Sequence, residues 1–385
     1  MEVVLSQRGA SRWIAGHPWI FRSDISPPAT LAGGEVVRVC DPRGRCLGQA
    51  FYSRISKISL RRLCRDEQPV DEAFFRRRIQ VAVQLRKAML PGESTWRAIH
   101  GDADELPGLV VDRYGDYLSV QFLIPATEQR REMFTRLLVE EFGCRGIVNR
   151  SDSSVRALEG LPAEKGVIHG SVPDTVPMRE GQLELAVNLL EGQKTGAFLD
   201  QRENHILAGR YARGRALDCF SYVGGFALQM ARRAEQVTAI DSSELACAQI
   251  RANVGRNQLG NVDVLCANVF DFLRAEADAG KQYDTIVLDP PAFARNKAAR
   301  DASLRGYKEI NLRAMQLLRP GGYLISSSCS HHIDEEHFEA MLQSAAADAH
   351  REVQIIERRG AGRDHPVLLA LRETRYLKCY VLRVL

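Results

Sequence analysis

Residues 283–291 read YDTIVLDPP, an apolar strand pattern that ends in Asp289-Pro290-Pro291. A second apolar segment, residues 323–328, reads YLISSS and runs directly into Cys329, 40 residues after Asp289. Parallel strands of one sheet end at a common edge, and open α/β sheets bind ligands at that edge. If both segments are such strands, a carboxylate and a thiol meet at a ligand-binding edge.

The sequence around these two segments alternates strand and helix patterns from about residue 190 onward. Amphipathic helical stretches separate most of the predicted strands. The strands are predicted at residues 216–220, 236–240, 262–266, 285–288, 323–328, 353–356 and 376–382. This alternation predicts an α/β fold with a doubly wound sheet.

The first 70 residues show short strand patterns separated by turn residues, as in the DPRG sequence at 41–44. We expect a small β-barrel there. Residues 1–70 hold 11 Lys and Arg against 6 Asp and Glu, a net charge of +5, whereas the remaining 315 residues hold 41 against 42, a net of −1. A basic module on a neutral body favours an anionic partner, most simply nucleic acid. A solvated basic face is the alternative.

The region between the barrel and the sheet mixes both patterns. A helical stripe of apolar residues begins after Asp71, a hairpin turn is predicted at Tyr114-Gly115-Asp116, and a second helix is predicted at about 126–142. This order predicts an α+β domain. The predicted domains are therefore residues 1–70, 71–185 and 186–385.

The composition argues against several classes of protein. No run of about 18 apolar residues predicts a membrane span, and the amino terminus shows no signal-peptide pattern. The nine cysteines are scattered without a C-x-x-C pair, which disfavours zinc ribbons, iron–sulfur clusters and a disulfide framework and favours a reducing cytoplasm. A zinc site at His331, His332 and His337 is disfavoured because no H-E-x-x-H motif accompanies it, so no metal is expected.

The turn after the first predicted strand of the sheet reads SYVGGF at residues 221–226. Gly224 and Gly225 allow the backbone to approach a ligand closely. The pattern is not G-x-G-x-x-G, so a pyrophosphate at the end of the helix is disfavoured. A turn between strand and helix without a bound cofactor is the alternative.

Two polar residues follow the next two strands. Asp241 stands 23 residues after Asp218, where a carboxylate can accept hydrogen bonds from both ribose hydroxyls of an adenosine. It could instead cap a helix, although Ser242 or Ser243 could fill that role. Asn268 could recognise the exocyclic amine of adenine, or it could cap the helix that starts at the next residue.

Residues 192–204 read GQKTGAFLDQREN and precede the sheet. The lysine–threonine pair hints at a phosphate loop, but the glycines that the G-x-x-x-x-G-K-[ST] pattern requires are absent. A lid over a cofactor fits better. In such a lid Phe198 would stack, and Arg202 and Asn204 would reach polar groups.

Asp289 and Cys329 suggest methylation of cytosine at C5. The two prolines after Asp289 stiffen the loop and remove two amide donors, which suits a rigid wall beside a flat base. A buried cysteine is usually a small hydrophobe, but Cys329 stands past a strand end. Its thiol needs a cationic or hydrogen-bonding environment to act as a nucleophile, and His331 and His332 could supply one.

Several of these stretches together resemble the RlmI family of bacterial S-adenosylmethionine-dependent 23S rRNA cytosine-C5 methyltransferases. The resemblance covers all three predicted domains in order. It rests on residues 16–21, 48–52, 100–112, 192–204, 217–226, 287–293 and 328–330.

The resemblance implies an N-terminal PUA-type β-barrel, a central α+β domain and a C-terminal Rossmann-like, seven-stranded class I methyltransferase sheet. It assigns catalysis to Cys329 as nucleophile and to Asp289. We expect S-adenosylmethionine to be bound by Phe198, Gln201, Arg202, Asp218, Phe220, Tyr222, Gly224, Asp241, Ser242, Asn268 and Asp289. Asn268 stands where an aspartate is frequent in the family. We expect 23S ribosomal RNA to be bound by Arg12, His17, Trp19, Arg54, Lys57, Arg61 and Arg62.

In the implied reaction the thiolate of Cys329 adds to cytosine C6, C5 attacks the sulfonium methyl, and a base removes the C5 proton. Related enzymes carry a second cysteine after the acid, where this chain has Pro290-Pro291-Ala292. The target base must leave its stack. The alternatives are a methyltransferase acting on a purine nitrogen, a non-catalytic RNA-binding protein and a nucleotide-dependent oxidoreductase. The modified nucleotide and the formation of a homodimer stay open.

Overall fold

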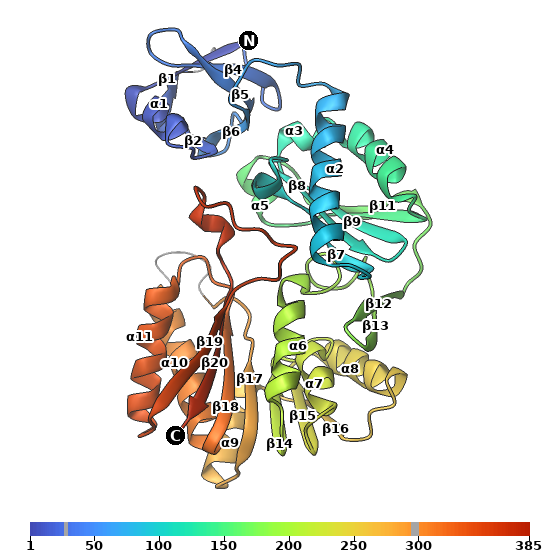
Figure 1. Cartoon of the computed structure of the whole chain (residues 1–385), viewed down its shortest axis with the longest axis vertical. Coiled ribbons are helices and arrows are strands. Elements are labelled where there is room, and N and C mark those ends of the chain that lie inside the picture. Colours follow the sequence, from blue (N-terminus) through green and yellow to red (C-terminus); the bar gives the residue numbers. More distant parts are fainter. Residues whose placement is uncertain (27–29, 294–299) are drawn as a thin grey trace. The chain divides into compact units, whose positions relative to one another are not determined.

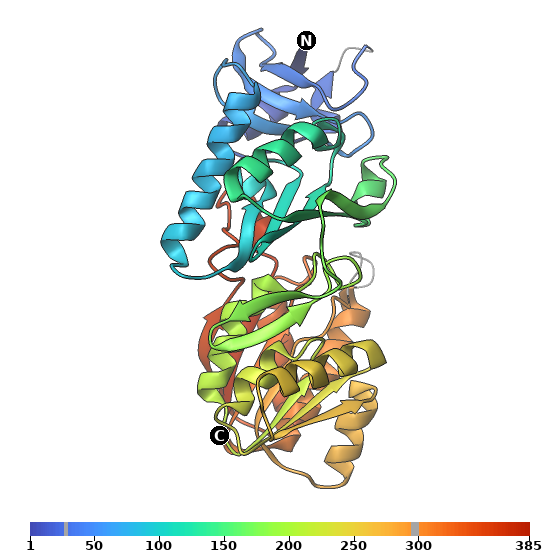
Figure 2. The ribbon, with the colours of Figure 1, turned by 90° about the vertical axis from the view of Figure 1, so that its right-hand side faces the viewer.

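The computed structural model describes residues 1–26, 30–293 and 300–385 of the chain, shown in two orthogonal views in Figure 1 and Figure 2. The chain forms two compact units. The first comprises Met1–Met178, Ala186–Leu199 and Arg363–Thr374, and the second comprises Arg179–Leu185, Asp200–Gly362 and Arg375–Leu385. Each unit is therefore assembled from three separate stretches of chain.

The N-terminal part of the first unit is a six-stranded sheet with the order β2-β6-β5-β4-β1-β3. Its core is formed by alternate strand residues such as Val3, Val37 and Leu60, together with Trp13 of the helix. The elements are β1 (Glu2–Leu5), α1 (Gln7–Ile14), β2 (Trp19–Phe21), β3 (Ile25–Ser26), β4 (Val36–Cys40), β5 (Cys46–Tyr52) and β6 (Ile58–Cys64). The predicted barrel of the PUA type is confirmed.

The central part of the first unit is a five-stranded sheet with the order β11-β10-β9-β8-β7 and helices packed on it. Asp71 caps its first long helix by accepting a hydrogen bond from the Phe74 amide, so the helical pattern begins where the sequence predicts it. The elements are α2 (Glu72–Met89), β7 (Thr95–His100), β8 (Leu109–Tyr114), β9 (Tyr117–Phe122), α3 (Pro125–Glu128), α4 (Arg131–Phe142), β10 (Gly146–Ser151), α5 (Val155–Leu158) and β11 (Glu164–Gly170).

A buried polar network closes the first unit. The guanidinium of Arg86 is fully buried, donates to both carboxylate oxygens of Asp104 and also donates to the Asp364 carbonyl, 278 residues further along the chain. The Asp364 carboxylate accepts from the Arg97 amide at 2.9 Å. Thr195 donates to Asp112. The two late stretches of chain are thus tied to the central sheet by buried hydrogen bonds.

The second unit is built on a seven-stranded sheet with the order β16-β15-β14-β17-β18-β20-β19. The first five strands are parallel, and β20 runs antiparallel to both of its neighbours. The strands are β14 (Arg215–Cys219), β15 (Gln236–Asp241), β16 (Val262–Cys266), β17 (Tyr283–Leu288), β18 (Leu318–Ser328), β19 (Val353–Arg359) and β20 (Lys378–Val384). All seven predicted strands are confirmed, with shifted ends.

Helices cover both faces of this sheet (Figure 1). Leu217, Ile286 and Leu324 share one hydrophobic core with side chains of three helices on one face. The helices are α6 (Arg202–Tyr211), α7 (Gly225–Ala231), α8 (Glu244–Arg256), α9 (Val269–Asp278), α10 (Arg300–Leu317) and α11 (Glu335–Asp348), of which α9, α10 and α11 form that core. The short hairpin β12 (Val176–Glu180) and β13 (Leu183–Val187) connects the two units along the chain.

The strand order reverses at β14, since β15 lies on one side of it and β17 on the other. The crevice beyond such a switch point is where open α/β sheets bind ligands. The loop that follows Cys219 therefore marks the place to search for a site.

Candidate functional site

The loop after β14 has a strained backbone. Phe220 and Tyr222 have positive φ angles of 65° and 51°, and Gly224 has a φ of 90°. A non-glycine residue in this region is uncommon, and such strain concentrates at ligand sites. Ser221 holds the loop, since its hydroxyl donates to the Asp218 carbonyl at 2.8 Å and accepts from the Ile240 amide at 3.1 Å. The strained conformation is thus tied to two strands.

Asp218 lies beneath this loop. Its carboxylate is fully buried and accepts a hydrogen bond from the Ala227 amide in the first turn of α7 at 2.9 Å. Among the described residues no hydrogen bond reaches its other oxygen. Burial raises the pKa of Asp218 to about 7. The structure gives Asp218 a supporting role, which differs from the predicted direct contact with the cofactor.

The two glycines of the loop are required by packing. A Cβ at Gly225 would lie 2.4 Å from the His205 ring, and a Cβ at Gly224 would lie 2.4 Å from Leu228. His205 itself accepts or donates at 2.9 Å to Glu180 and packs edge-on against Phe226. Burial lowers the pKa of His205, but the Glu180 carboxylate outweighs it, so the net shift is upward. Neither His205 nor Glu180 was identified from the sequence, since their contact joins residues 25 positions apart.

Asp241 is half-buried at the end of β15, and its carboxylate faces the loop. One oxygen accepts from the Tyr222 amide and the other from the Ser243 amide, both at 2.9 Å. Ser243, not Asp241, caps α8, because its hydroxyl accepts from the Ala246 amide. A carboxylate has about four acceptor sites, so two remain for ribose hydroxyls. Ser242, also predicted as a cofactor contact, is exposed beside it.

Asn268 caps α9, as one of its two interpretations from the sequence predicts. Its side-chain oxygen accepts from the Phe270 and Asp271 amides at 2.9 and 3.3 Å. An exocyclic amine needs an acceptor, and this oxygen is already engaged. The amide nitrogen of Asn268 is a donor and suits a ring nitrogen of adenine better. The adenine contact stays a prediction.

Asp289 follows β17 at the same edge and is oriented by the start of α6. Gln201 donates to a carboxylate oxygen of Asp289 at 2.8 Å, and Asn204 donates to the Gln201 side-chain oxygen at 2.6 Å. Gln201, Arg202 and Asn204 are all buried. The second half of the predicted lid thus lies against Asp289. Phe198 belongs to the first unit, where Lys194 lies over its ring, and its stacking on a cofactor stays a prediction.

Cys329 directly follows β18 and is a half-buried free thiol. Strands β17 and β18 are parallel, with Leu288 paired to Ser326, so Asp289 and Cys329 both stand just beyond paired strand ends. The predicted meeting of acid and thiol at one edge is confirmed. His331 and His332 are exposed, and the His331 ring lies 5.3 Å from the Tyr376 ring. The buried cation beside Cys329 in sequence space is instead Lys378 of β20, which the sequence analysis missed.

The residues predicted to bind RNA divide into exposed and buried groups. Arg54 and Lys57 are exposed between β5 and β6, and Arg12 lies over the Phe21 ring. Arg61 is buried and forms a 2.7 Å ion pair with Glu159, so its predicted contact with a phosphate is disfavoured.

The other three predicted RNA contacts are partly engaged within the first unit. The Trp19 indole donates to Asp102 at 2.9 Å, and a ring nitrogen of His17 accepts from the Trp19 amide at 3.1 Å. Arg62 is half-buried, with its guanidinium over the Trp13 ring, and burial lowers its pKa. These side chains belong to the folded module first, and the exposed Arg54 and Lys57 are the better candidates for phosphates.

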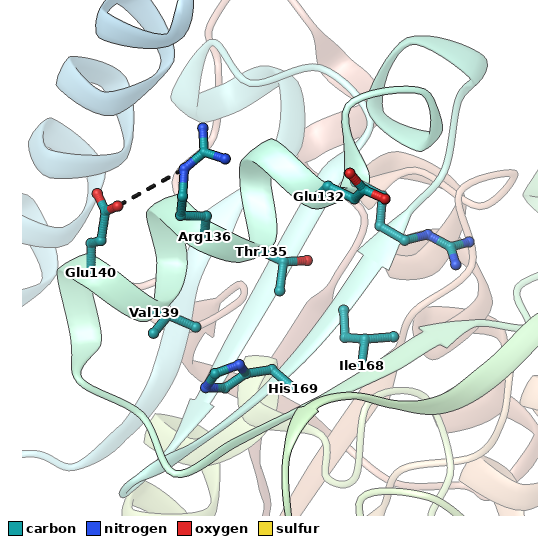
Figure 3. A pocket seen from close by; sticks show the side chains of 8 residues that line it. Glu132, Thr135, Arg136, Val139, Glu140, Ile168 and His169 are labelled. Carbon is teal, nitrogen blue, oxygen red and sulfur yellow. Dashed lines mark ion pairs between the residues drawn. The ribbon is translucent and has the colours of Figure 1, made fainter.

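An open pocket of about 390 Å³ lies on the central sheet, between α4 and β11 (Figure 3). Its arginines are paired with carboxylates, Arg131 with Glu128 and Glu164 and Arg136 with Glu72. This pairing removes the positive charge that an anion site would need. Within the described ranges no cluster of three His, Cys, Asp or Glu side chains could hold a metal ion, and no helix could cross a membrane.

Two family models match the chain. A PUA-like domain matches residues 3–65, and an S-adenosylmethionine-dependent methyltransferase matches residues 150–368. The structure of SMU.776 complexed with SAH aligns over the whole of both chains with a TM-score of 0.86 at 21% identity, which shows a shared fold. The chain is an S-adenosylmethionine-dependent methyltransferase.

Curated relatives narrow this class. The Ribosomal RNA large subunit methyltransferase I of Erwinia tasmaniensis is 38% identical over the full length of both chains. The protein of the same name from Shewanella amazonensis is 40% identical, covering 96% of this chain and 95% of the relative. The chain belongs to the ribosomal RNA large subunit methyltransferase I family.

The residues described above fit the cofactor of this family. The strained loop exposes backbone near the switch point, Asp241 offers acceptors for ribose hydroxyls, and Asn268 offers amide donors for a base. When bound, S-adenosylmethionine supplies an electrophilic methyl carbon at this edge.

The contact between Gly225 and His205 can be tested with a matched pair of glycines. We expect Gly225→Ala to lower the melting temperature and weaken S-adenosylmethionine binding, because overpacking a buried ring costs about 1–3 kcal/mol. Gly255→Ala, in open space on α8, should be neutral or stabilising by up to about 1 kcal/mol. Thermal melts and calorimetric titration measure both. Equal melting temperatures for the two variants would contradict the packing role.

The buried charge of Asp218 predicts a pH dependence of stability. Its pKa is raised in the folded state, so the folded protein holds a proton that the unfolded chain releases, and stability falls between about pH 4 and pH 7. Asp218→Asn keeps an acceptor and removes the charge. The melting temperature of the variant relative to the wild type should therefore rise across that window and stay constant above it. A difference independent of pH would show that Asp218 is ionised throughout.

Proposed function

We propose that this protein methylates C5 of a cytosine in 23S ribosomal RNA through a covalent adduct between Cys329 and cytosine C6. The observation that carries the proposal is the half-buried free thiol of Cys329 at the sheet edge that also holds Asp289 and the cofactor loop. The names of the full-length relatives support ribosomal RNA of the large subunit as substrate. A ribosomal substrate also suits the cytoplasm that the scattered cysteines suggest.

The chemistry requires a nucleophile because cytosine C5 is unreactive towards a methyl group. The Cys329 thiolate forms a carbon–sulfur bond at C6, and the ring electrons move to C5, which takes the methyl group. A base then removes the C5 proton, the carbon–sulfur bond breaks, and the thiolate is regenerated. Pro290-Pro291-Ala292 provides no thiol for this last step. The identity of the base is left unassigned.

Asp289 suits recognition of the cytosine. A carboxylate accepts a hydrogen bond from the exocyclic amine N4, which distinguishes cytosine from uracil. Gln201 holds one oxygen of this carboxylate, and Asn204 holds Gln201, so the acceptor is oriented before the base arrives. The rigid prolines that follow Asp289 form a flat boundary at which an extruded base can rest.

The Cys329 mechanism is tested by single cysteine variants. We expect Cys329→Ala to abolish transfer of labelled methyl groups to 23S rRNA, while Cys266→Ala, which removes an exposed thiol on β16, keeps the wild-type rate. Bisulfite sequencing of rRNA from cells with and without the gene identifies the base. Calorimetry must show that both variants still bind S-adenosylmethionine.

Two outcomes would replace the proposal. A Cys329→Ala variant that methylates normally would favour attack by a purine nitrogen with an inert cysteine. A wild-type protein without measurable affinity for S-adenosylmethionine would favour a non-catalytic RNA-binding protein.

The basic N-terminal module is proposed to bind RNA phosphates through Arg54 and Lys57. The double variant Arg54→Ala/Lys57→Ala should weaken RNA binding and reduce the slope of log affinity against log salt by about 2, one for each lost phosphate contact. Lys281→Ala, an exposed lysine in the turn before β17, is the control and should leave the slope unchanged. Filter binding at several salt concentrations measures both slopes. An unaltered slope in the double variant would exclude these two side chains from the RNA surface.

A further inference from the structure

Lys378 is a buried cation for which neither the packing nor the proposed chemistry has yet given a reason. It opens β20 opposite Ser328 and is only 2% exposed. Lysine is almost never fully buried unless its ammonium group is paired. Among the described residues, Lys378 has no carboxylate partner within ion-pair distance.

The ammonium group of Lys378 is bound by backbone carbonyls on both sides of the cleft edge. It donates to the Ser330 carbonyl and to the Tyr376 carbonyl, each at 2.7 Å. Ser330 directly follows Cys329, so this contact holds the cysteine loop against β20. An ammonium has three donors, and these two carbonyls use two of them.

The charges around Lys378 indicate what the third donor can serve. Burial lowers the pKa of Lys378 to about 8, while interactions with Cys329, Asp334 and Glu335 act in the opposite direction. Cys329 is the largest of these favourable interactions. A lysine with this pKa still carries most of its charge at neutral pH.

We propose that Lys378 is a positioning residue that stabilises the thiolate of Cys329 and fixes its loop for attack on the base. The inference rests on the proposed function for its purpose, but the ion pair it describes exists independently of methyl transfer. The thiol proton leaves to solvent, and the negative charge that remains on sulfur lies near a buried ammonium of fixed position. A cationic neighbour is one of the few devices that make a cysteine nucleophilic at neutral pH.

A purely structural role would also explain the two carbonyl contacts. A neutral amide donor could replace them in that case, so loss of the charge alone would leave the thiol unaffected. The other titratable groups around the cysteine loop are Asp289 after β17, Tyr307 of α10, His331, Asp334, Glu335 at the start of α11, and Tyr376. Two of these, Asp334 and Glu335, are acids that oppose a thiolate, which leaves Lys378 as the buried group that favours it.

The test measures the reactivity of Cys329 without methyl transfer. Limiting iodoacetamide is added to the full-length protein between pH 6 and pH 9, and the alkylation rates of Cys329 and of the exposed Cys266 are followed peptide by peptide by mass spectrometry. Cys266 serves as the internal control in every sample. The variants are Lys378→Gln, which keeps amide donors without the charge, and Lys378→Arg, which keeps the charge.

In the wild type, the pH midpoint of Cys329 alkylation should lie below that of Cys266. In Lys378→Gln it should rise by about one pH unit, a roughly tenfold slower reaction at pH 7, while Cys266 is unchanged. Lys378→Arg should restore most of the wild-type rate. Binding of S-adenosylmethionine checks that each variant is folded.

Two results would overturn the inference. One is a wild-type Cys329 midpoint at or above that of Cys266, which needs no variant. The other is a folded Lys378→Gln variant whose Cys329 profile overlays the wild type. Failure of the proposed function looks different, since Cys329→Ala would then methylate normally while the alkylation profiles still followed Lys378.

Discussion

The parallel register of β14, β17 and β18 is the constraint on which the rest of the site depends. Cys219 pairs with Leu288, and Leu288 pairs with Ser326, so three strands end within a few residues of a common line. The cofactor loop, Asp289 and Cys329 begin where these strands end. Three functional groups from distant parts of the sequence are thereby placed together by backbone hydrogen bonds alone. A shift of one strand by a single residue would move its group away from the other two.

The loops at this edge are supported mainly from below. Ser221 bridges two strands, Asp218 holds the first turn of α7, and the His205–Glu180 pair fills the space that Gly225 leaves. Only the backbone and a few oriented acceptors face outward, as with the carboxylate of Asp241. Such an arrangement suits a small charged cofactor, because its binding groups are oriented before it arrives.

Strand positions and the acid–thiol edge could be predicted from the sequence because they depend on local patterns and on one rule about parallel sheets. The function of Arg61 could not, because its partner Glu159 lies 98 positions away and only the fold brings them together. The capping role of Asn268 was one of two interpretations that the residue type allows equally. Lys378 was missed for a similar reason, since a lysine at the start of an apolar strand looks like a solvent-exposed end residue until the strand is placed inside the sheet.

The buried contacts of Arg86 with the Asp364 carbonyl set an order of assembly during synthesis. The first unit contains the N-terminal half of the chain, yet its polar network needs residues from Arg363–Thr374. A ribosome delivers those residues only after nearly the whole second unit has emerged. The N-terminal unit must therefore wait, with the guanidinium of Arg86 lacking that acceptor, while the seven-stranded sheet is being made. The two units mature together, and neither half of the gene encodes a self-contained part.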